Sequence, residues 1–264
     1  MYDYHTHSTF SADGDCSMDE MIRAAIRLGL SEIAVTDHHD PEYSDLSWYV
    51  DLDIPAYEST LDAAAAKYAD SIRVVRGIEI GMQQGIANLD SARVVKSYPF
   101  DFVIGSIHSA SGYAVDTPPY LGVRDRRAAV RDYYMELILC LKEFDDFDVI
   151  GHFNFIDRYI DSIPPEDEYW DLAEEALRLI VSMGKGIEIN TSAWRFWHGS
   201  HHTPTARVLK RYVELGGETV TTGSDAHDIS RIGSHLKEAE EMAAAAGLRY
   251  IATFKDRSPS YVKL

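Results

Sequence analysis

Short apolar runs alternate with helical patterns along almost the whole chain, and this alternation constrains the fold more than any other feature. The runs are rich in β-branched and aromatic residues, which is typical of buried parallel strands. They lie at residues 2–4, 32–35, 73–75, 102–104, 147–150, 186–189 and 219–221. A chain that repeats strand and helix in this way predicts an α/β fold, either a parallel barrel or a doubly wound sheet.

Helical patterns fill the intervals between these runs. Residues 17–20 have the form of a capping box, so a helix is expected to begin there. Further helices are predicted over residues 57–69, 126–144, 166–183, 205–215 and 235–247, and a long loop over 40–56. Single α/β barrels commonly have a length near 264 residues, so the sequence predicts one domain over residues 1–264.

Side chains that can bind metals follow nearly every predicted strand. The carboxyl ends of parallel strands meet at one face of a barrel or sheet, which is where the chemistry of these folds takes place. Imidazole and carboxylate groups gathered there without thiolates suit Zn, Mn or Fe. The polar residues after the strands are His5, His7, Asp37, His38, Glu79, His108, His152, Asn190, Thr191, Asp225 and His227.

Each of these motifs has an ordinary structural explanation when it is taken alone. His5 and His7 would point to the same side of an extended segment, but pairs with this spacing are common. A single histidine after a strand is more often a hydrogen-bonded core residue than a ligand. The combination favours metal ions, because converging buried carboxylates without counter-ions would each cost several kcal/mol, roughly speaking.

The formal net charge of -18 disfavours a nucleic-acid partner, since phosphates would be repelled. Bound divalent cations would make the real charge less negative. The only cysteines, Cys16 and Cys140, are far apart in the chain, which indicates a reducing compartment rather than a disulfide framework. No signal peptide or bilayer-long apolar run is evident, so we expect a cytoplasmic protein without a membrane partner. These features leave the oligomeric state open.

The motifs that contain these strand-end residues, taken in their order along the chain, resemble those of the PHP (polymerase and histidinol phosphatase) family. The similarity is closest to the monofunctional histidinol-phosphate phosphatases, on residues 77–81, 151–159, 188–192 and 215–217. The resemblance implies a distorted (β/α)7 barrel in a single domain, with three divalent metal ions (Zn, Mn or Fe) in a trinuclear centre. The motifs that carry it are His5-Thr6-His7-Ser8, Ser11-Ala12-Asp13, Thr36-Asp37-His38, Gly77-Ile78-Glu79, Gly105-Ser106-Ile107-His108, Gly151-His152 and Gly223-Ser224-Asp225-Ala226-His227.

The resemblance also implies a ligand set for each ion. The first ion would take His5, His7, Glu79 and Asp225, the second Glu79, His108 and His152, and the third Asp13, His38 and His227. Many relatives have histidine at the position of Asp13, and two further departures, Asn154 and Ala193, lie near the expected pocket.

The activity implied by the resemblance is hydrolysis of a small phosphate monoester, most closely L-histidinol phosphate to L-histidinol and phosphate in histidine biosynthesis. Metal ions would neutralise phosphoryl charge and lower the pKa of water. Arg158 and Arg195 would bind the phosphate, because guanidinium matches it in a bidentate manner. Glu79 would bridge two ions, and either Asp225 or a water on the third ion would supply the proton that the leaving alkoxide needs. Glu79 and Asp225 complete the expected catalytic residues.

Other functions remain open at this point. A PHP phosphoesterase acting on a nucleotide or short oligonucleotide fits the same motifs, although the acidic charge and the lack of a basic, aromatic-rich groove argue against a long strand. A catalytically silent metal-binding PHP module is a second alternative, against which stands the complete set of ligand types. A metal-dependent amide hydrolase on a similar barrel is a third, but no predicted strand ends in lysine.

Overall fold

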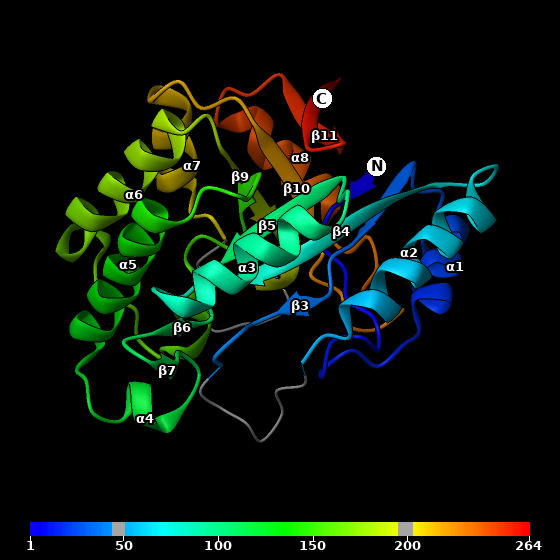
Figure 1. The fold of residues 1–264 in the computed structure, drawn as a ribbon. Coiled ribbons are helices and arrows are strands. Elements are labelled where there is room, and N and C mark those ends of the chain that lie inside the picture. The colour runs from blue at the N-terminus through cyan, green and yellow to red at the C-terminus, as the bar shows by residue number, and fades with distance from the viewer. Residues whose placement is uncertain (44–50, 195–202) are drawn as a thin grey trace.

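The computed structural model describes residues 1–43, 51–194 and 203–264, and its centre is a nearly closed barrel of parallel strands (Figure 1). The strand order around the barrel follows the sequence. The barrel strands are β1 (Tyr2–Asp3), β2 (Glu32–Val35), β4 (Arg73–Gly81), β5 (Phe102–Ser106), β8 (Val149–Ile150), β9 (Gly186–Asn190) and β10 (Val220–Gly223). The expected (β/α)7 barrel is therefore confirmed.

The barrel closes where the segment after β1 runs beside the segment after β10. The backbone N–H of Tyr4 donates to the carbonyl of Thr222 at 2.9 Å, and that of Asp225 donates to the carbonyl of His5 at 2.8 Å. The backbone N–H of His7 donates to Ala226 at 2.8 Å. These bonds hold the segment that contains His5 and His7 beside the segment that contains Asp225 and His227.

Most of the predicted helices lie close to their expected positions. Helix α1 (Met18–Arg27) begins with the predicted capping box, in which the side chain of Ser17 accepts from the backbone of Glu20. Figure 1 shows α5, α6 and α7 together on one side of the barrel and α1 and α2 on the other. The other helices in the predicted regions are α2 (Ile54–Tyr68), α5 (Arg126–Glu143), α6 (Trp170–Ser182), α7 (Ala206–Glu214) and α8 (Leu236–Ala245).

Several elements differ from the sequence-based expectation. Strand β4 continues to Gly81, so that Glu79 lies inside the strand rather than after it, paired with His38 of the short strand β3 (His38–His39). Asn190 likewise ends β9 instead of following it. The predicted helix over residues 166–183 is divided into the short 3-10 helix η2 (Glu166–Glu168) and α6. The elements that were not predicted are β3, α3 (Ile86–Ser97), β6 (Ser109–Ala110), β7 (Tyr113–Ala114), α4 (Pro118–Leu121), β11 (Tyr250–Lys255) and β12 (Ser258–Lys263), and the short 3-10 helices η1 (Phe155–Tyr159) and η3 (Thr191–Trp194).

The hairpin of β11 and β12 covers the end of the barrel at which the strands begin. Phe254 of β11 is 3% exposed and packs with Tyr4 and Phe102 inside the barrel. At the turn, Arg257 donates from Nε to Asp148 at 2.6 Å. This end is therefore filled by packing and ion pairs, which leaves the carboxyl ends of the strands as the open face.

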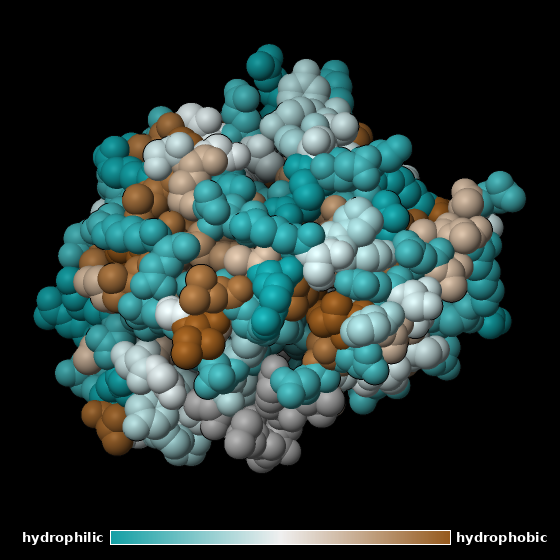
Figure 2. Space-filling model, viewed as in Figure 1, coloured by the Kyte–Doolittle hydropathy of each residue, from teal (hydrophilic) through white to brown (hydrophobic). Residues whose placement is uncertain are grey.

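The face in Figure 2 is mainly hydrophilic and carries small, separate apolar patches. Within the described ranges, none of the helices has the length and apolar character needed to span a bilayer.

Candidate metal centre and phosphate pocket

His5 and His7 lie at the carboxyl end of β1 and point into the barrel mouth. Their imidazole centroids are 5.0 Å apart, and both side chains are buried. Thr6 between them points to the other side, where its Oγ1 donates to the carbonyl of Ala34 at 2.7 Å. The expected alternation of an extended segment thus places both imidazoles on one side.

Glu79 stands at the centre of the cluster, with its two carboxylate oxygens facing different imidazoles. Its Oε1 is 3.0 Å from Nε2 of His152 and 3.4 Å from Nε2 of His108. Its Oε2 is 3.2 Å from Nε2 of His5 and 3.6 Å from Nε2 of His7. This is the arrangement expected of a carboxylate that bridges two ions.

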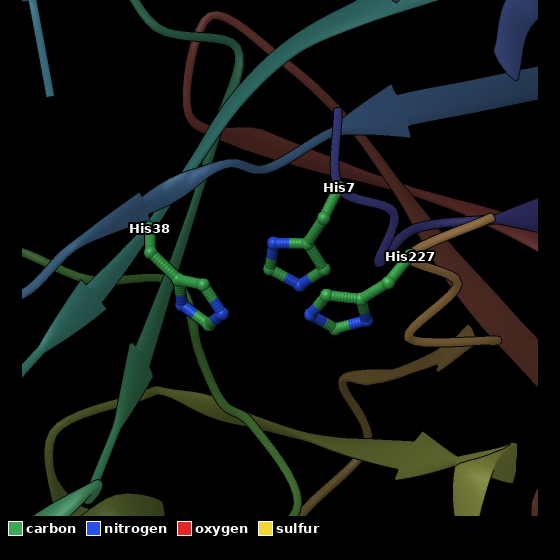
Figure 3. A group of neighbouring side chains, drawn as sticks. All are labelled: His7, His38 and His227. Carbon is green, nitrogen blue, oxygen red and sulfur yellow. The ribbon is translucent and has the colours of Figure 1, made fainter. Parts of the chain in front are cut away.

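A third group forms around His227, which follows β10. Its Nε2 is 3.1 Å from Asp13, and Nε2 of His38 is 3.8 Å from the other oxygen of Asp13. Figure 3 shows how the rings of His7, His38 and His227 converge from three separate segments. His38 also faces Glu79, since its Nδ1 is 2.9 Å from Oε2. Proximity therefore connects His38 to both the third group and the bridging carboxylate.

Asp225 joins the first group to the pocket beside it. One of its oxygens is 3.4 Å from Nε2 of His7, and the other accepts from Nη2 of Arg158 at 3.1 Å. Its φ of 52° is in the left-handed region, which non-glycine residues rarely adopt and which is found more often at functional sites.

The chemistry of these atoms fits divalent ions. Nε2 of His5 and Oε2 of Glu79 lie 3.2 Å apart, yet each lacks a hydrogen-bond partner among the described residues. The same is true of Nε2 of His7 and Nε2 of His227, within the part of the chain that is described. Buried polar atoms are normally paired, so several lone pairs aimed at one space indicate a cation site.

The pKa values of the cluster show how strongly its charges interact. Burial raises the pKa of Glu79, but the imidazoles of His5, His38 and His108 outweigh this effect and hold it well below the usual value. Burial lowers the pKa of His5, but the carboxylates of Glu188, Glu79 and Asp225 raise it well above the ordinary value. The pKa of His7 is shifted the other way, well below its ordinary value, by burial and by the neighbouring imidazoles of His227 and His38.

Further carboxylates hold the ring nitrogens that face away from the cluster. Nδ1 of His5 is 2.8 Å from Glu188, and Nδ1 of His108 is 2.7 Å from Asp40. Such contacts fix the tautomer and the ring orientation of a metal-binding imidazole. Asp37, which the sequence placed among the strand-end residues, accepts from the backbone and side chains of Ser8 and Ser11 and so orders the loop after His7.

Two glycines leave the space that these carboxylates need. A Cβ on Gly223 would lie 2.2 Å from Glu188 Oε1 and 2.4 Å from Cβ of His5. A Cβ on Gly81 would lie 1.8 Å from Asp40. Glycine is therefore required at both positions by close approach.

Arg158 lies in the wall of a cavity of about 270 Å³ that opens onto the cluster. Its Nη2 donates to Ser192 Oγ and to Asp225, and its guanidinium stacks over Phe155 at 4.7 Å. The cavity is also lined by residues that sequence reasoning did not single out, namely Tyr43, Asp116, Phe155 and Tyr159.

The structure thus brings together ten of the predicted site residues. These are His5, His7, Asp13, His38, Glu79, His108, His152, Arg158, Asp225 and His227. Arg195 lies outside the described residues. The supporting carboxylates Asp40 and Glu188 were missed as such, because their partners lie 68 and 183 positions away in the chain.

A β/α barrel whose strand ends gather imidazoles and carboxylates in this way defines a class of barrel proteins that bind divalent metals at the carboxyl face. The chain belongs to the PHP domain family, whose model matches residues 3–192. This finding confirms the family that the sequence motifs resemble.

Relatives are similar over nearly the full chain. A histidinol-phosphatase from Lactococcus lactis is 28% identical, with 96% of this chain and 93% of that protein covered. A probable histidinol-phosphatase from Clostridium acetobutylicum is 31% identical, with 94% and 95% covered. The crystal structure of the Lactococcus lactis histidinol phosphate phosphatase, complexed with zinc, L-histidinol and phosphate, superposes with a TM-score of 0.88 over 98% of both chains, at 28% identity.

Proposed function

We propose that this protein is a metal-dependent phosphatase that hydrolyses L-histidinol phosphate to L-histidinol and phosphate in histidine biosynthesis. The observation that carries the proposal is the convergence of imidazoles and carboxylates, from His5 to His227, beside the partly buried guanidinium of Arg158. The histidinol-phosphatase relatives, and the Lactococcus lactis structure with zinc, L-histidinol and phosphate, support this substrate.

We assign three divalent ions to the cluster, each of them Zn, Mn or Fe. The two oxygens of Glu79 face different imidazoles, those of His5 and His152, which supports a bridging role for its carboxylate. The contacts of Asp13 with His38 and His227 support a third ion there. The assigned ligands are His5, His7, Glu79 and Asp225 for the first ion, Glu79, His108 and His152 for the second, and Asp13, His38 and His227 for the third.

When bound, the ions would neutralise phosphoryl oxygens and make water more acidic. Arg158 would donate its N–H groups to the phosphate, where a guanidinium forms strong, charge-assisted bonds. Arg195 is the second predicted phosphate-binding residue. The leaving alkoxide needs a proton, and Asp225 is the carboxylate beside Arg158 at the pocket. Burial raises the pKa of Asp225, but His5, His7 and Arg158 hold it well below the ordinary value, so its carboxylate is ionised and would act only as a relay, passing to the alkoxide the proton that the attacking water releases.

We also infer that the functional unit extends over residues 1–264. The family model ends at residue 192, but Asp225 and His227 complete the cluster, and β10 closes the barrel. A chain cut after residue 192 would lack two of the assigned ligands and one wall of the barrel.

Kinetic comparison of Mn-loaded protein on L-histidinol phosphate, nucleotide monophosphates and bisphosphates, and an aryl phosphate tests the proposal. We expect the highest kcat/KM on L-histidinol phosphate, loss of activity on chelation and its return with Mn or Zn. A higher kcat/KM on a nucleotide would favour the PHP phosphoesterase alternative. Metal uptake without turnover of any ester would favour a catalytically silent module.

A further inference from the structure

Strand β9 and the residues directly after it carry a buried polar face. Glu188 and Asn190 alternate along β9, so their side chains share one side, and Ser192 follows in the 3-10 helix η3; the three residues are 0%, 0% and 1% exposed. The proposed chemistry gives none of them a role. Buried polar side chains at these three positions need specific partners.

Glu188 contacts the imidazole of His5 and the backbone of His152, two residues whose imidazoles face different oxygens of Glu79. Oε1 of Glu188 is 2.8 Å from Nδ1 of His5, and its Oε2 accepts from the backbone N–H of His152 at 3.0 Å. In the neutral form of His5 that binds a metal, this contact favours the proton on Nδ1, which leaves the lone pair of Nε2 facing the cluster.

Asn190 continues the contacts toward the pocket. Its Nδ2 donates to Oε2 of Glu188 at 3.0 Å, and its Oδ1 accepts from the backbone N–H of Ser192 at 3.0 Å and from the Ser192 hydroxyl. The hydroxyl of Ser192 in turn accepts from Nη2 of Arg158. Every donor and acceptor in this series is used in one consistent direction, from Arg158 to the carboxylate of Glu188.

An unbroken series of hydrogen bonds therefore joins His5 in the metal cluster to Arg158 in the phosphate pocket, through residues whose side chains lie in the barrel interior. Arg158 closes the series on the other side, since it also donates to Asp225 at 3.1 Å. Networks of this kind strengthen each member and fix a single geometry.

We propose that Glu188, Asn190 and Ser192 are positioning residues that hold the metal-facing His5 and the phosphate-facing Arg158 in one geometry, so that zinc affinity and phosphate affinity depend on the same hydrogen bonds. The kinetic part of this inference rests on the proposed phosphatase function, whereas the binding part does not. None of the three residues needs to touch an ion or a substrate for this role.

Binding of zinc to metal-free protein, and of inorganic phosphate to zinc-loaded protein, tests the proposal in single variants. A glutamine has one acceptor oxygen where Glu188 uses two, so Glu188→Gln should weaken zinc binding by about 10- to 100-fold. Ser192→Ala should weaken phosphate binding about tenfold, with a rise in KM larger than the fall in kcat, and should weaken zinc binding by a smaller factor because Ser192 is farther from His5 along the series. Ser182→Ala, the same substitution at the end of α6, is the matched control and should alter neither affinity.

Asn190→Ala is the decisive variant, because Asn190 bonds to Glu188 on one side and to Ser192 on the other and so links the two ends of the series. It should weaken both zinc and phosphate binding, with far-UV circular dichroism unchanged. The double variant Glu188→Gln with Ser192→Ala should lose less phosphate affinity than the product of the single losses, because one series is broken twice.

Zinc and phosphate affinities of folded Asn190→Ala that both equal those of the wild type would overturn the positioning role, as would fully multiplicative losses in the double variant. Wild-type protein that binds as expected but turns over no phosphate ester would refute the proposed function and leave this inference standing. If the protein turns over L-histidinol phosphate but Asn190→Ala changes neither zinc nor phosphate affinity, the proposed function stands and this inference is refuted.

Discussion

Replacement of Glu79 by glutamine is the sharpest test of the metal assignment. The side chain is fully buried, and its two oxygens lie within 3.6 Å of five imidazoles, those of His5, His7, His38, His108 and His152. Glutamine removes the negative charge and replaces one oxygen by an NH2 group, which has no lone pair available for a metal ion. Both ions that we assign to Glu79 would lose a ligand from this one substitution.

The size of the effect follows from the burial of the site. Removing one partner from a buried charged group costs about 3–5 kcal/mol, which is roughly 10²- to 10⁴-fold in affinity for each ion. Elemental analysis after gel filtration should therefore find about two fewer ions per chain than in the wild type. Glu136→Gln is the matched control, since Glu136 is also buried but bonds to Gln84 and Ser111 outside the cluster. Near-normal metal content in Glu79→Gln would refute the bridging role.

Three further predictions concern the neighbouring residues. Arg158→Ala should raise KM for L-histidinol phosphate by about tenfold or more while metal content stays near the wild-type value; a large loss of metal with unchanged KM would argue against phosphate binding. Asp13→Ala should remove one ion only, as measured by elemental analysis, because Asp13 contacts His38 and His227 alone among the proposed ligands; unchanged occupancy would move the third site elsewhere. The third prediction concerns pH. Burial lowers the pKa of His38, but the carboxylates of Glu79 and Asp13 outweigh the effect of burial and raise this pKa to about 9. Because the folded state binds this proton more tightly than the unfolded state, protonation of His38 stabilises the fold. The stabilisation is complete below the pKa of the unfolded chain, near 6.5, and is lost as the pH rises through about 9. Metal-free protein should thus lose thermal stability over this range, whereas zinc affinity should rise; a metal-free Tm that increases from pH 6.5 to 9 would contradict this.

The barrel and the ligand residues could be predicted because both leave local signals. Each barrel strand contains a short apolar run, and each assigned ligand except Asp13 lies at or near the carboxyl end of such a strand. Helix α3 left no comparable signal, since its buried face carries Asn88 and Ser91 and its exposed face carries Ile86 and Leu89. The apolar period of 3.6 residues is therefore blurred.

The terminal hairpin was missed for a different reason. Asp256 and Arg257 form its two-residue turn with φ of 49° and 62°, a conformation usually signalled by Asn-Gly or Asp-Gly. The structure stabilises the turn from outside, because Asp101 accepts from both backbone N–H groups and Asp148 accepts from Arg257. Contacts across more than a hundred positions cannot be read from local pattern.

The same limit applies to the residues that support the site. The pairing of Glu188 with His5 and of Asp40 with His108 depends on how the closed barrel brings distant segments together. The glycines at 81 and 223 belong to recognisable motifs, but the close approach that requires them is visible only in three dimensions.

Titration of metal-free protein with zinc, followed by elemental analysis of the desalted product, tests the central claim most directly. If side chains from His5 to His227 jointly surround a cation cluster, the wild type should retain close to the three ions that we assign. Protein that emerges without any bound transition metal, at zinc concentrations that saturate ordinary histidine–carboxylate sites, would contradict the account.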